Sequence, residues 1–374
     1  MHVLFVAHSS STAGAERTLV ALASAAARGG DHVTVSIPRK GPIERLIRDR
    51  LPGAEVIVQP CQWWMGVRHR TFTGALRTLQ SLAQLVPWLM LLRRTRPDAV
   101  VIGSTVTPAP LLAAALAGTP RSIILGESIR SNPTLRSLIP KALIVRALDA
   151  WSDVSIAVSE YAASQYRRPT LIEYPPIEIP ETVSEVRDEP PHMLVAVLLG
   201  TLSTEKGQFD LIEAARRIVA SGAPVRIELY GDAAPDDLAR LHDMIWDADV
   251  ESVLRYRGAS SNPIGVLAGA DVSLVCSRNE AYGRVTIESV LVGTPVVGYD
   301  LGGTREILRD GGGILVEPEP AAMASILGRL ARDPAALRGL RSSAAERARS
   351  RAGVGDADRQ WSRLRDALAR ERLR

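Results

Sequence analysis

The chain has 374 residues, 46% of them hydrophobic and 23% charged, which is the composition of an ordinary soluble globular protein. This length accommodates two domains. The two cysteines, Cys61 and Cys276, lie far apart in the sequence, which excludes a disulfide framework and fits a reducing cytoplasm. The start of the chain lacks the basic residues of a signal peptide, and no run of about 18 apolar residues predicts a membrane span.

The net charge of +4 is unevenly distributed along the chain. Residues 1–180 contain 20 Lys and Arg against 12 Asp and Glu, whereas the remainder contains 25 against 29. A basic first half favours an anionic acceptor or contact with a membrane surface, but a solvated face on an arginine-rich protein explains it equally well. We expect a cytoplasmic protein without a nucleic-acid partner, and peripheral membrane contact of the basic half stays open as an alternative.

The first half alternates strand-like apolar runs with amphipathic helices, the pattern of a parallel α/β domain. A Ser- and Thr-rich loop, residues 8–13, joins the first strand to the first helix, but the dinucleotide fingerprint G-x-G-x-x-G is absent. Ser159 is placed to cap a helix directly after the last expected strand of this sheet. The expected strands are residues 2–7, 32–37, 55–58, 98–102, 121–125 and 153–158.

One loop of the first half carries candidate binding residues. Two adjacent tryptophans are followed by basic side chains; indole faces stack on sugar rings, and arginine binds phosphate or carboxylate. We therefore predict acceptor binding by Trp63, Trp64, Arg68 and Arg70. The alternative is that one tryptophan belongs to the core and the basic residues face solvent. Residues 73–94 predict a long amphipathic helix, for which packing on the core is favoured over contact with a membrane.

A Pro- and Glu-rich stretch, residues 177–191, predicts a linker. It separates a first domain of residues 1–176 from a second of residues 192–356, and residues 357–374 predict a final helix. The string Asp247-Ala248-Asp249 resembles a metal-binding pattern, but it follows a helix end and lacks the strand that such a motif requires. We therefore interpret it as surface and predict no metal site.

Residues 272–299 predict a strand, a loop, a helix and a second strand. The loop follows the carboxyl end of a strand, where open α/β sheets bind ligands. The first helical amides form an anion site together with the helix dipole, and the carboxylates of Glu280 and Glu288 lie before and after them. This order suits a nucleotide sugar, in which a diphosphate joins a sugar to a ribose; two solvated glutamates are the alternative. The amides that begin this helix are those of Gly283, Arg284, Val285 and Thr286.

Glu280 and Glu288, with seven residues between them, are followed by Gly293-Thr294-Pro295-Val296-Val297 and Leu301-Gly302-Gly303. This arrangement resembles the signature of the retaining family-4 glycosyltransferases of the GT-B fold, the glycosyl transferases group 1. The resemblance covers nearly the whole chain and is strongest over residues 195–316. It implies two Rossmann-like domains facing each other across a cleft, with the acceptor in the first, the donor in the second and a final helix that crosses back to the first.

The resemblance implies catalytic roles for Lys206, at the leaving diphosphate, and Glu280, at the transferred sugar. It places Glu288 on the ribose, and Gly14 and Thr201 in two donor-binding loops. The family carries an arginine where this chain has Thr201, so another cation is expected to replace it. Arg284 and Arg130 are the candidates.

On the acceptor side, Glu127 and Arg130 follow the expected strand at residues 121–125. The family often carries a basic residue at the position of Gly126, so a histidine contribution to the reacting sugar is in doubt here.

The resemblance implies transfer of a sugar from a nucleotide sugar, with UDP slightly favoured, to a hydroxyl with retention of configuration. The acceptor is expected to be a glycan, a lipid-linked sugar or a small molecule, and no metal or cofactor is expected. The alternatives are a nucleotide-sugar epimerase or phosphorylase on the same fold, and a non-catalytic nucleotide-sugar-binding protein.

Overall fold

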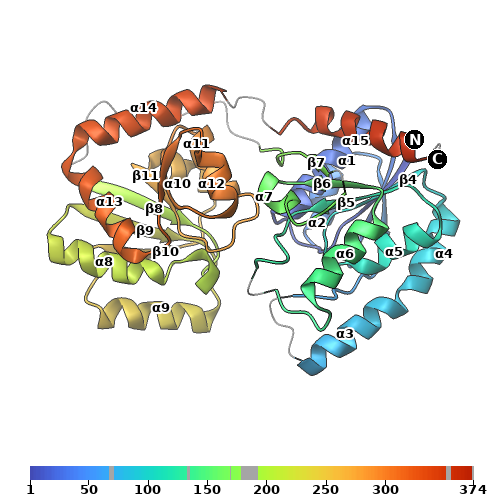
Figure 1. The fold of residues 1–374 in the computed structure, drawn as a ribbon, viewed down its shortest axis with the longest axis horizontal. Coiled ribbons are helices and arrows are strands. Elements are labelled where there is room, and N and C mark those ends of the chain that lie inside the picture. Colours follow the sequence, from blue (N-terminus) through green and yellow to red (C-terminus); the bar gives the residue numbers. More distant parts are fainter. Residues whose placement is uncertain (67–70, 133–134, 169, 178–192, 351–354, 373–374) are drawn as a thin grey trace. The chain divides into compact units, whose positions relative to one another are not determined.

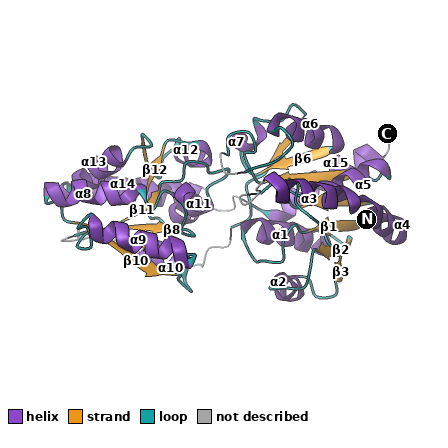
Figure 2. Ribbon diagram, turned by 90° about the horizontal axis from the view of Figure 1, so that it is seen from below, coloured by secondary structure: helices purple, strands orange, loops and turns teal. Residues whose placement is uncertain are grey.

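The computed structural model describes residues 1–66, 71–132, 135–168, 170–177, 193–350 and 355–372. The chain divides into two compact units (Figure 1): unit 1 is Met1–Pro176 with Val354–Arg374, and unit 2 is Ile177–Gly353. Each unit contains one parallel sheet with helices on either side of the strands (Figure 2). The predicted α/β class with two Rossmann-like sheets is thus confirmed.

The unit 1 sheet has the strand order β3-β2-β1-β4-β5-β6-β7, and every neighbouring pair is parallel. Its central strands are buried on both faces, which explains their continuous apolar sequences. The expectation that residues 153–158 are the last strand is wrong, because β7 pairs with β6 at the edge. The strands are β1 His2–Val6, β2 His32–Ile37, β3 Glu55–Val58, β4 Ala99–Ile102, β5 Arg121–Leu125, β6 Val154–Ala157 and β7 Thr170–Ile172.

The helices of unit 1 follow these strands in alternation. Ser159 caps the short α7 as predicted, because its hydroxyl accepts a hydrogen bond from the Ala162 amide at 2.9 Å. The helices are α1 Gly14–Arg28, α2 Ile43–Arg50, α3 Thr71–Ala83, α4 Leu85–Thr95, α5 Pro108–Leu116, α6 Lys141–Trp151, α7 Glu160–Ala163 and α15 Ala357–Arg372.

The segment expected to form one long core-packed helix forms two helices, α3 and α4. Pro87 lies in the first turn of α4 and has no amide hydrogen to donate to the preceding turn, which accounts for the interruption near Gln84. Trp88, Leu91 and Leu92 of α4 are buried. The opposite face is exposed, so the expectation that the leucines of this segment pack on the core is wrong for that face.

The unit 2 sheet has the order β10-β9-β8-β11-β12-β13 and is also parallel throughout. The strand order reverses between β8 and β11, so the loops that follow these two strands meet at one edge. The strands are β8 Leu194–Leu199, β9 Val225–Tyr230, β10 Leu254–Gly258, β11 Val272–Val275, β12 Val296–Tyr299 and β13 Gly313–Val316. The helices are η1 Thr204–Lys206, which is a 3-10 turn, α8 Asp210–Ser221, α9 Pro235–Asp247, α10 Pro263–Gly269, α11 Arg284–Leu291, α12 Gly302–Leu308, α13 Pro320–Arg332 and α14 Pro334–Ser350.

The last helix, α15, packs on α1 of unit 1 and is also held by a buried carboxylate in the turn after α1. Asp31 accepts a hydrogen bond from the indole of Trp361 at 2.9 Å and pairs with the N-terminal ammonium at 2.6 Å and with Arg365 at 3.1 Å. The Asp31 side chain is fully buried. This one carboxylate therefore ties the first and last segments of the chain together.

Gly207 brings the loops after β8 and β11 together in unit 2. Its φ of +77° lies in the left-handed region, and a Cβ at this position would lie 2.4 Å from the carbonyl oxygen of Cys276. The backbone of the β8 loop therefore rests directly against the end of β11. The Arg278 amide adds a hydrogen bond to the carbonyl of Glu205 at 3.1 Å.

We predict that Asp31→Ala lowers the free energy of unfolding by about 3–5 kcal/mol, because it leaves the buried Trp361 indole and the largely buried N-terminal ammonium without their acceptor. Asp358→Ala is the matched control. It removes the exposed Arg28–Asp358 pair, 2.8 Å apart between the same two helices, and should cost at most about 1 kcal/mol. Urea denaturation followed by tryptophan fluorescence measures both, and equal losses would contradict the buried role of Asp31.

We also predict that Gly207→Ala destabilises unit 2 by about 1–3 kcal/mol more than Gly222→Ala does. Gly222 has a comparable φ of +63°, but nothing lies within 4 Å of a Cβ placed there. The difference between the two variants therefore reports the close approach to Cys276 rather than backbone strain alone. Thermal unfolding with the same midpoint for both variants would show that the β8 loop can move away at no cost.

Candidate functional site

The loop after β8 is held in shape by the buried side chain of Gln208. Its amide nitrogen donates to the carbonyls of Gly200 and Thr201 at 3.1 and 3.2 Å, and its amide oxygen accepts from the Ser203 amide at 3.3 Å. The Ser203 hydroxyl in turn accepts a hydrogen bond from the backbone amide of Lys206 at 3.3 Å. The loop is thus closed on itself, and Lys206 projects from a fixed turn.

The loop after β11 places Glu280 opposite Lys206. The Lys206 Nζ and a Glu280 carboxylate oxygen are 2.8 Å apart. The backbone carbonyl of Glu280 accepts a hydrogen bond from the Gly303 amide at 2.8 Å, which ties this loop to the start of α12. A Cβ on Gly303 would lie 2.2 Å from the Tyr282 carbonyl oxygen, so only glycine permits this approach.

Helix α11 begins directly beyond this loop, after Gly283 with a φ of +92°. Arg284, in its first turn, donates to Glu288 at 3.1 Å across one helical turn. The second terminal nitrogen of Arg284, Nη1, is buried and has no hydrogen-bond partner among the described residues. The start of α11 therefore combines helix-start amides and a cation with an unused donor, and a carboxylate lies one turn further along.

These groups line one cavity of about 180 Å³ at the carboxyl ends of β8 and β11. Six predicted site residues meet there: Lys206, Glu280, Gly283, Arg284, Val285 and Thr286. Glu288 is joined to this set through Arg284, whereas Thr201 is exposed and does not line the cavity.

The chemistry of this cavity follows from its charges. Helix-start amides with an adjacent lysine bind a phosphate or diphosphate, and carboxylates at both ends accept hydrogen bonds from hydroxyl groups. Burial strongly raises the pKa of the Cys276 thiol, so this cavity-lining cysteine stays protonated and is not a nucleophile.

Gln208 is the residue of this site that sequence reasoning missed, although its place directly after Lys206-Gly207 could have indicated it.

Asp247 and Asp249 are exposed at the end of α9, as expected for surface residues. Within the described part of the chain, His, Cys, Asp and Glu form no cluster that could hold a metal ion.

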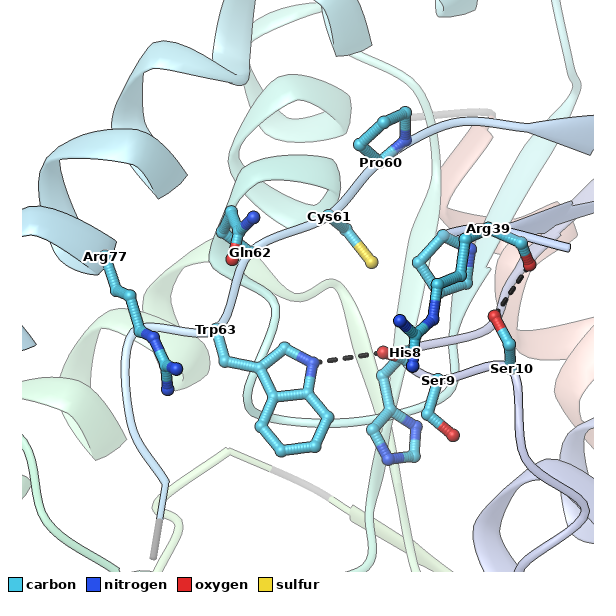
Figure 3. Close-up of a pocket in the computed structure, with 10 residues that line it drawn as sticks. His8, Ser9, Ser10, Arg39, Pro60, Cys61, Gln62, Trp63 and Arg77 are labelled. Atoms are coloured by element: carbon cyan, nitrogen blue, oxygen red, sulfur yellow. Dashed lines mark hydrogen bonds between the residues drawn. The ribbon is translucent and has the colours of Figure 1, made fainter. Parts of the chain in front are cut away.

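Unit 1 has a second cavity of about 300 Å³ where β1, β2 and β3 end (Figure 3). His8 follows β1, Arg39 follows β2, and Trp63 follows β3, while Arg77 reaches in from α3. In Figure 3 the indole of Trp63 lies between Arg77 and His8, and its nitrogen donates to the His8 carbonyl at 3.0 Å. Among the described residues, this lining contains two arginines and no carboxylate. Cys61 also lines this cavity, and burial raises the pKa of its thiol to about 12.

His8 is oriented by a buried carboxylate that sequence reasoning missed. Its Nδ1 is 2.9 Å from Glu16, which is 1% exposed and also accepts from the Ser9 hydroxyl at 2.6 Å. Burial by itself raises the pKa of Glu16, but the hydrogen bonds and charge it meets at His8 and Ser9 outweigh this and lower the pKa below its ordinary value. The pair fixes the imidazole ring at the cavity wall.

The other acceptor candidates are dispersed in unit 1. Trp64 is 4% exposed, and its ring stacks on that of Trp151 with the centroids 5.9 Å apart. Its indole nitrogen donates to the Thr105 carbonyl. Trp64 therefore packs in the core and offers no face to a ligand. Arg68 and Arg70 lie outside the described residues.

The remaining predicted residues of unit 1 lie after β5 and at the start of α1. Glu127 is half-buried and Arg130 is exposed, and neither lines the cavity around Trp63. The backbone amide of Arg130 donates to the Gln165 side chain at 2.7 Å. Gly14 begins α1, where its carbonyl accepts from the Thr18 hydroxyl at 3.0 Å.

Comparison with known proteins shows which family the second half of the chain resembles. Residues 181–351 match the family described as glycosyl transferases group 1. The D-inositol 3-phosphate glycosyltransferase of Streptomyces bingchenggensis is 32% identical over 170 residues, which are 42% of this chain and 37% of that protein. The lipopolysaccharide core biosynthesis glycosyltransferase LpsE of Rhizobium meliloti is 33% identical over 131 residues, which are 35% of this chain and 37% of LpsE. The matched segments thus span less than two fifths of either relative.

Solved structures resemble the chain over nearly its full length. Anabaena HepE in complex with UDP and glucose superposes with a TM-score of 0.76 at 20% identity, covering 97% of this chain and 99% of HepE. Sucrose-phosphate synthase from Thermosynechococcus elongatus gives a TM-score of 0.75 at 16% identity, covering 98% and 99%. At these identities the likeness establishes the fold. Residues 181–351 are thus similar to the glycosyl transferases group 1 family, and the fold of the chain is GT-B.

Proposed function

We propose that the protein is a retaining glycosyltransferase that transfers a sugar from a UDP-sugar to a hydroxyl group of an acceptor. The observation that carries this proposal is the cavity at β8 and β11, where Lys206, Glu280 and the start of α11 meet. The names of the relatives support glycosyl transfer, and the UDP bound in the HepE structure supports the choice of donor.

The donor is proposed to bind along the first turn of α11. The diphosphate lies at the helix-start amides and Lys206, the transferred sugar at Glu280, and the ribose at Glu288. Arg284 serves two purposes in this arrangement: it orients the Glu288 carboxylate and offers its second terminal nitrogen to the diphosphate. It thereby replaces the arginine that the family carries at the position of Thr201.

The reaction proposed is attack on the same face as the leaving group. The bond between the anomeric carbon and the diphosphate oxygen breaks, the acceptor oxygen bonds to that carbon, and the acceptor proton passes to the departing diphosphate. Negative charge grows on the diphosphate as the bond breaks, so Lys206 and the α11 amides stabilise the transition state more than the ground state. This scheme requires no metal ion.

The acceptor is proposed to bind in the unit 1 cavity. Trp63 is partly exposed there and offers a flat face for a sugar ring, while Arg39 and Arg77 suit a phosphate or carboxylate group on the acceptor. His8, held by Glu16, provides a fixed hydrogen-bonding group beside that ring. Release of UDP only when an acceptor hydroxyl is supplied separates transfer from the epimerase, phosphorylase and binding-protein alternatives.

We predict that the two glutamates affect different kinetic constants. Ribose contacts do not change during the reaction, so Glu288→Ala should raise the donor KM roughly 10- to 150-fold with less effect on kcat, the equivalent of about 1.5–3 kcal/mol of hydrogen bonding. Glu280→Gln should mainly lower kcat, because the sugar ring gains positive charge at the transition state. Steady-state kinetics in EDTA, with binding of free UDP measured alongside, distinguish the two effects.

The exposed Glu251, also in unit 2, provides the control for this pair, and Glu251→Ala should leave both constants unchanged. The assignment is wrong if Glu280→Gln abolishes UDP binding while Glu288→Ala leaves it intact.

We predict that Trp63→Ala and Arg77→Gln each raise the acceptor KM roughly tenfold while leaving hydrolysis of the donor nearly unchanged. Trp63→Phe keeps an aromatic face and should recover most of the loss. Trp246→Ala is the control, because Trp246 is 73% exposed on α9 of unit 2. Equal losses of transfer and hydrolysis in the Trp63 and Arg77 variants would count against an acceptor site here.

A further inference from the structure

The outer face of α3 and α4 in unit 1 is apolar and exposed. Five large hydrophobic side chains on these two helices are 51 to 64% exposed. Single exposed hydrophobic residues are ordinary, but a contiguous row marks an interaction surface. We call this row the outer stripe; it consists of Leu76, Leu79, Leu82, Val86 and Met90.

The two helices present the outer stripe as one continuous surface. The amide of Gln84 donates to Gln80, and the amide of Trp88 donates to Gln84, so helical hydrogen bonds continue across the junction. Steps of three and four residues keep all five side chains within an arc of about 120° on a helix of 3.6 residues per turn. Figure 1 shows α3 and α4 along the border of unit 1, and α4 packs on α5 through the opposite side, where Trp88, Leu91 and Leu92 are buried.

The segment of the sequence that carries the outer stripe has charges of a single sign. Residues 56–97 contain six arginines and no aspartate or glutamate. Arg93 and Arg94 are exposed in the last turn of α4, at the margins of the arc that the stripe occupies. A helix face that only meets water usually mixes both charges, whereas this face combines apolar side chains with arginines alone.

The occupant of such a face has to be apolar and negatively charged. A second copy of this chain fits poorly, because a two-fold interface would bring these arginines against one another with no carboxylate in the segment to pair with them. An anionic bilayer meets both requirements, with acyl chains for the leucines and phosphates for the arginines. No helix among the described residues is long and apolar enough to cross a membrane.

We propose that the outer stripe docks the protein onto an anionic lipid surface, with Arg93 and Arg94 contacting the lipid phosphates. This inference does not depend on glycosyl transfer, and its test uses neither donor nor acceptor.

The test is flotation of the full-length protein with vesicles of phosphatidylcholine, with and without an equal part of phosphatidylglycerol, at low and at high salt. We expect binding to the anionic vesicles at low salt and weaker binding to the neutral ones. Arg93→Gln/Arg94→Gln should weaken binding about 30-fold, because each arginine near an anionic surface contributes about a fivefold factor. Leu79→Ser/Met90→Ser should weaken it at least about tenfold.

Two matched control variants test whether binding depends on this surface or on positive charge and exposed apolar side chains anywhere in the protein. Arg45→Gln/Arg48→Gln removes the same charge from the exposed side of α2 in unit 1, and Trp246→Ser/Val219→Ser removes two exposed apolar side chains from unit 2. Both should retain binding, and circular dichroism should give the same melting temperature for all variants.

Three results would overturn the proposal: absence of binding to the anionic vesicles, equal losses in the stripe and control variants, or equal binding to neutral and anionic vesicles. A concentration-dependent dimer that Leu79→Ser/Met90→Ser dissociates, without vesicle binding, would assign the face to a second copy instead.

Discussion

The reversal of strand order between β8 and β11 is the constraint on which the proposed donor site depends. Where the strand order of a parallel sheet reverses, the loops after the two adjacent strands leave the same edge in opposite directions, and a space opens between them. Here Gly207 lets the first loop rest against the Cys276 carbonyl, and the result is a cavity with Lys206 on one wall and Glu280 on the other. The opposed positions of Lys206 and Glu280 are therefore a consequence of topology, because backbone contact brings their two loops together.

The attraction within that pair is secondary because the groups are partly hydrated. Lys206 and Glu280 are 2.8 Å apart, but their side chains are 38% and 18% exposed, so solvent screens them. The pair nevertheless holds an ammonium and a carboxylate in the cavity, where a ligand with both an anionic group and hydroxyl groups can bind them. When a diphosphate enters, Lys206 can turn toward it while Glu280 retains its backbone anchor at Gly303. A preformed loop with an exchangeable ion pair suits a site that has to release a charged product.

The sequence was sufficient to predict features that follow from local order. A strand, a polar loop and a helix in succession place Glu280 and Arg284 at a sheet edge, and the structure gathers them there. Contacts between residues far apart in the sequence could not be predicted. Trp63 faces outward and Trp64 does not, because Trp151 covers the ring of Trp64. The orientation of α4 could not be predicted from the sequence for a different reason. Both of its faces are apolar, so periodicity alone could not decide whether the side with Trp88 or the side with Met90 meets the core.

Helix α3 connects the two proposed activities of unit 1. Arg77 reaches into the cavity beside Trp63, whereas Leu76 and Leu79 belong to the outer stripe on the same helix. If the stripe rests on lipid, the cavity lies within the width of one helix, about 10 Å, of the head groups. An acceptor with a negatively charged head and an apolar tail could then present its head to Arg77 without leaving the membrane. The two surfaces of one helix would thus select the acceptor by charge and by location.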